Sequence, residues 1–151
     1  MDSAILTSEQ VAQYRRAGYL QVADLLSDAK VYVFLEAEAQ PKPPEWKKLG
    51  LRKHTVDSQW KYLAAHPRIA GIAEQLLEGR PMIVQTMYIA KAPEGGKGIA
   101  LHQDANYIRN EPNTLMACWI AMSDTDRDNG GLCVGPGSHL GALQDTQPPQ
   151  D

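Results

Sequence analysis

The chain has 151 residues, of which 43% are hydrophobic and 22% charged, and its formal net charge is −3. This length and composition are typical of one globular domain with a hydrophobic core. A slight acidic excess argues against a general nucleic-acid binder and against an anionic-membrane binder, because both need clustered basic charge. No apolar run approaches the length of a membrane span, and Met1-Asp2-Ser3 does not begin a secretory signal.

The first third of the chain predicts helical scaffold. Thr7 can cap a helix in which Gln10 completes a capping box, and Gly18 supplies the stop. A short strand is expected at Tyr19–Val22. Ser27 then begins a second helix, which must end before the prolines that start at Pro41.

The segment Pro41–Trp60 is rich in proline, lysine and tryptophan and fits neither periodicity. We expect a long covering loop, a kind of segment that often carries function. Its cations could face an acidic ligand, although a solvated surface is expected for most of them: Lys47, Lys48, Arg52 and Lys53. His54 is expected to be an ordinary surface histidine. His66 is expected to cap a helix that begins at Pro67, so neither histidine is counted as a metal ligand.

From Pro81 the pattern becomes extended. The residues Pro81–Ala90 are rich in β-branched and aromatic types, which predicts a strand. Gln85 is the polar residue on a face that it shares with Met87 and Ile89. It is either a satisfied core amide or a hydrogen-bond donor to something in a cavity, and both interpretations stay open.

The central motif is Ile99–Asp104, where an apolar run ends in His102-Gln103-Asp104. In an extended strand residues i and i+2 share a face, so His102 and Asp104 point together while Gln103 points away. Imidazole and carboxylate, with one more imidazole, form the 2-His-1-carboxylate triad of non-haem Fe(II) oxygenases. That triad leaves coordination positions open for a cosubstrate and dioxygen.

The region after the motif predicts further strands and turns. Leu115–Met122 is expected to be a buried strand, in which Trp119 is either core or the wall of a ligand pocket. The acidic stretch Ser123–Gly131 lacks the pattern of a calcium loop and is expected to be a solvated turn. Leu132–Val134 is expected to be a short strand, followed by a tight turn at Gly135–His139.

Cysteine usage indicates a reducing compartment. Cys118 and Cys133 each lie inside an apolar run, so we expect buried free thiols and no disulfide framework. Free thiols favour the cytoplasm as the location.

Four blocks in a fixed order resemble the phytanoyl-CoA dioxygenase family. Their order and approximate spacing match, and the segment from Leu6 to Val22 is similar to the opening helix and strand of that family. The blocks are Leu101–Tyr107, Trp119–Met122, Asn129–Leu132 and Pro136–His139.

The resemblance implies an α+β fold with a mainly β core, namely a double-stranded β-helix (cupin-like jelly roll) with N-terminal helices packed outside. It implies an Fe(II)- and 2-oxoglutarate-dependent oxygenase that acts on a small-molecule substrate with dioxygen. From the charge balance above, no nucleic-acid or membrane partner is expected. His102 and Asp104 would be iron ligands. Gln85, Trp119 and Lys53 would contact 2-oxoglutarate.

The chain departs from the family pattern at its C-terminal side. The family's third iron ligand and its 2-oxoglutarate-binding arginine follow the Pro-Gly-Ser-His turn, and the family does not use the turn histidine, here His139, as a ligand. A jelly roll needs about eight strands, and fewer are predicted here. We therefore expect residues 1–151 to be a single domain, truncated before the distal strands. The alternative is a non-catalytic cupin-like binding domain, while a zinc hydrolase fits poorly.

Overall fold

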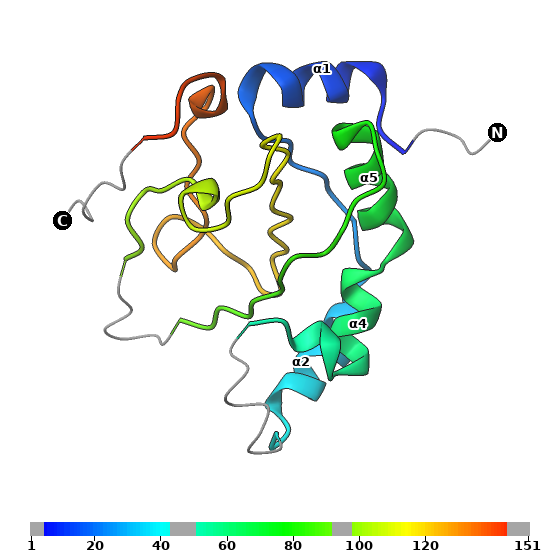
Figure 1. The fold of residues 1–151 in the computed structure, drawn as a ribbon. Helices are drawn as coiled ribbons and strands as arrows, with labels where there is room; N and C mark the ends of the chain where they lie inside the picture. Colours follow the sequence, from blue (N-terminus) through cyan, green and yellow to red (C-terminus); the bar gives the residue numbers. More distant parts are fainter. Residues whose placement is uncertain (1–4, 43–50, 92–97, 145–151) are drawn as a thin grey trace. The chain divides into compact units, whose positions relative to one another are not determined.

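The computed structural model describes residues 5–42, 51–91 and 98–144 (Figure 1). The chain divides into two compact units, Met1–Thr7 with Gln21–Ile89 and Ser8–Leu20 with Ala90–Asp151. Each unit therefore combines segments that are far apart in sequence.

The described residues of the first unit form the α-helices α2 (Asp28–Ala39), α4 (Ser58–Ala64) and α5 (Pro67–Leu77) and the 3-10 helix η1 (Lys53–Thr55). In Figure 1 the helix α2 lies beside α4, where the Phe34 and Trp60 rings meet edge to face with centroids 5.2 Å apart. The ring of Tyr88 packs on both, at 6.1 Å and 6.2 Å. These three rings form an aromatic core for this unit.

The expected ends of α2 and α5 are confirmed. Ser27 is the N-cap residue of α2, although its side chain makes no capping hydrogen bond. His66 is the N-cap residue of α5, and Pro67 occupies the first turn, where its missing N–H costs nothing.

The prediction of a covering loop is wrong for residues 53–55 and 58–60, which are helical. Residues 43–50 lie outside the described residues, and the rest of this segment holds η1 and the first turn of α4. Asp57 begins α4, because its Oδ1 accepts hydrogen bonds from the backbone N–H groups of Gln59 (2.8 Å) and Trp60 (3.2 Å). The expectation of a surface histidine is wrong for His54, which is half-buried with its Nδ1 3.0 Å from Thr86 Oγ1.

The N-terminal segment of the first unit is fixed to α5 by one amide side chain. Gln75 Oε1 accepts from the backbone N–H of Leu6 (2.9 Å), and Gln75 Nε2 donates to the carbonyl of the same residue (2.8 Å). Leu6 is almost fully buried. A single glutamine thus replaces the two backbone contacts that a neighbouring strand would make.

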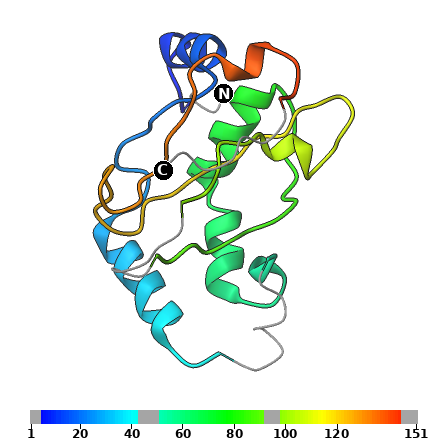
Figure 2. The same cartoon turned by 90° about the vertical axis from the view of Figure 1, so that its left-hand side faces the viewer.

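The second unit contains α1 (Ser8–Ala17) and the 3-10 helices η2 (Asp104–Asn106) and η3 (Ser138–Leu140). In Figures 1 and 2, η3 lies beside the C-terminal end of α1, where His139 Nε2 donates to the carbonyl of Arg15 (2.9 Å). The N–H of Gly137 donates to the carbonyl of Ala17 (2.8 Å). Gly18 ends α1 with φ +80, and a Cβ there would lie 2.4 Å from His139 Nδ1, so only glycine allows this approach.

The described residues contain one isolated antiparallel bridge, between Leu51 and Met87, and no strand ladder. Apart from this bridge, four segments that the sequence predicts as strands run without ladder hydrogen bonds in this part of the chain: residues 19–22, 81–90, 115–122 and 132–134. The jelly roll therefore stays a prediction.

The remaining expectations concern turns, thiols and membrane spans. The acidic stretch is a turn, as expected, in which Asp126 Oδ1 accepts from the N–H groups of Asp128 (2.8 Å) and Asn129 (3.0 Å). Cys118 and Cys133 are free, as expected, but the expected burial is wrong, because both are exposed in segments that pair with no strand among the described residues. Within the described ranges, no helix has the length and hydropathy needed to cross a bilayer.

Candidate metal centre

His102 and Asp104 lie side by side at the start of η2. The backbone of Gln103 between them is extended (φ −112, ψ 126), so the side chains on either side of it share a face. His102 Nε2 is 3.3 Å from Asp104 Oδ1, and both side chains are partly exposed. The geometric part of the sequence prediction is thus confirmed, whereas the ligand role stays a prediction.

The orientation of the His102 ring is set by its own backbone neighbour. Nδ1 lies 2.8 Å from the carbonyl oxygen of Ala100. A carbonyl only accepts hydrogen bonds, so Nδ1 carries the proton, and the Nε2 of a neutral ring presents a lone pair towards Asp104. This is the arrangement in which a protein backbone fixes the tautomer of a metal-binding histidine.

The donor set and its spacing fit a metal ion. A neutral Nε2 and a carboxylate Oδ1 are two acceptors facing each other, which is unfavourable unless a cation or a proton lies between them. Two ligand atoms about 2.1 Å from a metal and at a right angle to each other lie about 3 Å apart. The observed separation is close to this value, so His102 and Asp104 can serve as two adjacent ligands.

The described residues contain no group of three or more His, Cys, Asp or Glu side chains that could hold a metal ion. The other three histidines have different contacts. His139 donates to the carbonyl of Arg15 at the end of α1, and His54 contacts Thr86. His66 occupies the N-cap position of α5 without a capping bond from its side chain, and its Nε2 lies 3.4 Å from Lys30 Nζ. In the described part of the chain, none of these three histidines joins His102 and Asp104 in such a group.

Tyr107 is a neighbour of the pair that the sequence reasoning gave no role. Its ring meets the His102 imidazole edge to face, with centroids 5.7 Å apart and an interplanar angle of 74°. The 3-10 turn brings it there, because its N–H donates to the carbonyl of Asp104 (2.9 Å). The signal was its position three residues after Asp104, which is the spacing of one such turn.

The three predicted 2-oxoglutarate residues lie in different units. Trp119 belongs to the unit of the metal pair, and its side chain is 45% exposed. Gln85 and Lys53 belong to the other unit, and Gln85 is half-buried. Their part in cosubstrate binding stays a prediction.

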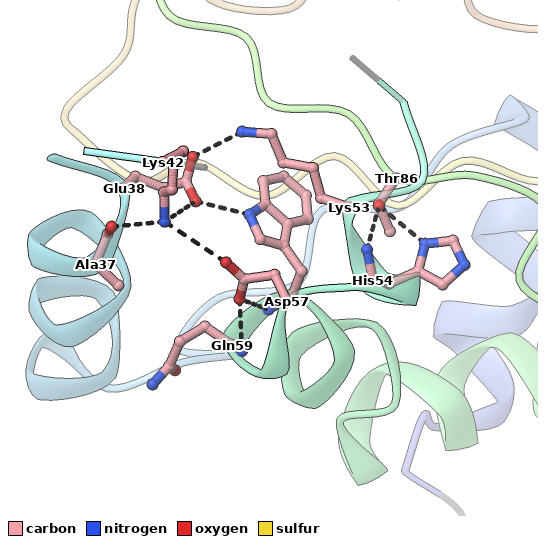
Figure 3. Close-up of polar contacts among 9 residues, drawn as sticks. Ala37, Glu38, Lys42, Lys53, His54, Asp57, Gln59 and Thr86 are labelled. Atoms are coloured by element: carbon pink, nitrogen blue, oxygen red, sulfur yellow. Dashed lines mark hydrogen bonds and ion pairs between the residues drawn. The ribbon is translucent and has the colours of Figure 1, made fainter. Parts of the chain in front are cut away.

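Lys53 lies in a cluster of charges and rings (Figure 3). Its Nζ donates to Glu38 Oε2 (2.9 Å). The same Nζ lies over the rings of Trp60 (5.3 Å) and Tyr88 (5.6 Å). Trp60 Nε1 donates to Glu38 Oε1 (2.8 Å), and Lys42 Nζ is 3.3 Å from the same oxygen. Burial alone would raise the pKa of Glu38, but these hydrogen bonds and the two lysine charges outweigh it, so the pKa lies below its ordinary value.

Comparison with known proteins shows the family. The family model for phytanoyl-CoA dioxygenase matches residues 5–150, so the chain belongs to the phytanoyl-CoA dioxygenase family. The chain is 32% identical to a phytanoyl-CoA dioxygenase of Arabidopsis thaliana, over 78% of this chain and 44% of that protein. It is 31% identical to the peroxisomal phytanoyl-CoA dioxygenase of Bos taurus, over 99% of this chain and 52% of that protein.

A third relative is the phytanoyl-CoA dioxygenase domain-containing protein 1 of Bos taurus, 36% identical over 67% of this chain and 36% of that protein. The chain thus spans about half or less of the length of these relatives. A comparison with solved structures found no significant match.

Proposed function

We propose that this chain carries two of the iron ligands of a non-haem Fe(II)- and 2-oxoglutarate-dependent dioxygenase that hydroxylates a small organic substrate. The observation that supports this most directly is the 3.3 Å approach of His102 Nε2 to Asp104 Oδ1, with Nδ1 tied to the carbonyl of Ala100. Family membership supports the same reaction class.

Each residue of the centre has a separate task. Asp104 offers a carboxylate oxygen, and His102 offers an Nε2 whose lone pair is kept available by the hydrogen bond at Nδ1. Tyr107 packs against one edge of the imidazole and limits its rotation. Iron bound there, with 2-oxoglutarate and dioxygen, would supply the oxidation of a substrate C–H bond with release of succinate and carbon dioxide.

The cosubstrate residues belong to the same proposal. Gln85 would donate hydrogen bonds to 2-oxoglutarate, and Trp119 would wall its pocket. Lys53 would pair with a carboxylate, which requires its ammonium to share or exchange its contact with Glu38. The reducing cytoplasm is the proposed compartment, and the two free cysteines support it.

The proposal is tested by titrating Fe²⁺ without oxygen into the full-length protein and its His102→Ala and Asp104→Ala variants. Metal affinity and 2-oxoglutarate-dependent succinate release should both be lost in each variant. The thermal midpoint of the metal-free protein should change little, because both side chains are partly exposed.

Two matched variants control for the loss of any histidine or any exposed carboxylate. His54→Ala and Asp128→Ala remove the same chemical groups from residues that are not part of the proposed pair and should keep metal affinity. Full Fe²⁺ affinity and succinate release in Asp104→Ala would contradict the assignment. Binding of metal without succinate release in the unmodified protein would favour a non-catalytic binding domain.

A further inference from the structure

We propose that Gln103 is a positioning residue for the metal pair. Its side chain fastens the turn that carries His102 and Asp104 to residues 138–144, and so holds the two ligands at their separation. This inference rests on the proposed function, because it assigns to Gln103 a part in building the same metal centre.

Both polar atoms of the Gln103 side-chain amide make hydrogen bonds. Its Nε2 donates to the carbonyl of Ser138 (3.2 Å), and its Oε1 accepts from the backbone N–H of Gln144 (2.8 Å). The extended backbone at Gln103 directs this amide away from the face shared by His102 and Asp104. Gln103 therefore never contacts the metal position, and it acts through its two neighbours.

A second amide in the same turn strengthens the connection. Asn106 Nδ2 donates to the carbonyl of Gln144 (2.8 Å). At its N-terminal end, the 138–144 segment is anchored to α1 through the hydrogen bond of His139 and that of Gly137, which directly precedes the segment. A continuous series of hydrogen bonds thus runs from the end of α1 through η3 to the metal pair.

The pair depends on this connection because little else holds it. Within the described part of the second unit, residues 98–107 have no ladder hydrogen bonds, and the hydrogen bonds within the segment are those of η2 and the contact of His102 Nδ1 with the carbonyl of Ala100. Metal affinity requires ligands held in place before the metal arrives, since any ordering on binding reduces the affinity. The Gln103 amide helps to hold the ligands in place, because it bonds to residues that lie 35 and 41 positions further along the chain.

The first unit offers a matched control. Gln75 makes the same double contact, one backbone N–H and one backbone carbonyl, with Leu6, a residue that takes no part in the metal centre. Methionine keeps the length of glutamine and removes both hydrogen bonds. Gln103→Met and Gln75→Met therefore remove the same interactions, and only the first lies beside the metal ligands.

The experiment titrates Fe²⁺ without oxygen into the full-length protein by calorimetry, for the unmodified chain, Gln103→Met, Gln75→Met and His102→Ala. Thermal midpoints of the metal-free proteins are measured in parallel. Gln103→Met should raise the metal Kd about tenfold, as loss of supporting residues around metal ligands commonly does. Gln75→Met should lower the thermal midpoint and leave the metal Kd unchanged.

The outcomes distinguish failure of the positioning role of Gln103 from failure of the proposed function. Equal metal affinity in Gln103→Met and the unmodified protein, or equal weakening in both methionine variants, overturns the positioning role but leaves the metal site standing. Binding that survives in His102→Ala, or no binding at all, overturns the proposed function and this inference with it. If Gln103→Met does not fold, Asn106→Ala replaces it, and a metal Kd unchanged in that variant also overturns the inference.

Discussion

His66 is the buried histidine of the first unit, only 5% exposed. Its Nε2 lies 3.4 Å from Lys30 Nζ, which can only donate, so the ring proton is on Nδ1. Among the described residues, that Nδ1 has no hydrogen-bond partner. Burial, followed by the charges of Lys30 and Arg68, lowers the pKa of His66 below its ordinary value.

This lowered pKa predicts a loss of stability in mild acid. Below about pH 6.5, the ordinary histidine pKa, His66 becomes protonated in the unfolded chain. In the folded chain its lowered pKa keeps it neutral down to a lower pH. The free energy of unfolding should therefore fall as the pH decreases from 6.5 through the folded pKa. Urea unfolding of the unmodified protein and of His66→Gln at pH 8 and pH 5.5 measures the difference.

In His66→Gln this part of the pH dependence should disappear. Lys30→Gln removes one of the neighbouring charges and should reduce it, because the folded pKa then returns towards its ordinary value. Parallel stability curves for the unmodified protein and His66→Gln between pH 8 and 5.5 would rule out the assignment.

At the scale of elements, α4 depends on its cap. Asp57→Ala removes the acceptor for the N–H groups of Gln59 and Trp60 and should cost about 1 to 2 kcal/mol of unfolding free energy. Ser27→Ala is the matched control, because Ser27 holds the same position in α2 without a capping bond and should cost far less. Chemical denaturation compares the two, and equal losses would contradict the capping role.

Helices could be predicted from the sequence where their start and stop signals were local. The cap at Thr7 and the stop at Gly18 predicted α1, because both signals lie within the helix or next to it. The helix α4 was missed inside the predicted loop, since its neighbours are proline, lysine and tryptophan. The signal that would have found it is Asp57, a good N-cap residue three positions before Trp60.

In the candidate site, too, the sequence predicted the local geometry but not the contacts between distant segments. The side-by-side placement of His102 and Asp104 follows from the alternation of an extended backbone, so the sequence predicted it. The bonds of Gln103 to residues 138–144 and of Lys53 to Glu38 join distant segments. Neither composition nor periodicity carries that information.

At the scale of the whole molecule, the exposed apolar side chains predict self-association. Large hydrophobic residues are exposed in the segments expected to be strands, for example Met82 (86%) and Leu132 (59%). Exposed apolar surface of this kind promotes association. Residues 1–151 on their own should form oligomers or aggregates, with an apparent mass in size-exclusion chromatography and light scattering that rises with concentration.

Met82→Lys with Leu132→Lys should reduce this association without lowering helical content. Tyr32→Lys, which changes an exposed aromatic residue on α2, is the control and should leave the association as it was. A monomer at every concentration would show that these segments are covered in solution.

The interleaving of the two units has a consequence for protein synthesis. Residues 8–20 leave the ribosome early, yet Arg15 accepts its hydrogen bond from His139, which is made 124 residues later. A ten-residue helix with no fully buried residue is marginal by itself in water. The helix α1 can therefore gain its contacts with residues 137 and 139 only after that turn has been synthesised.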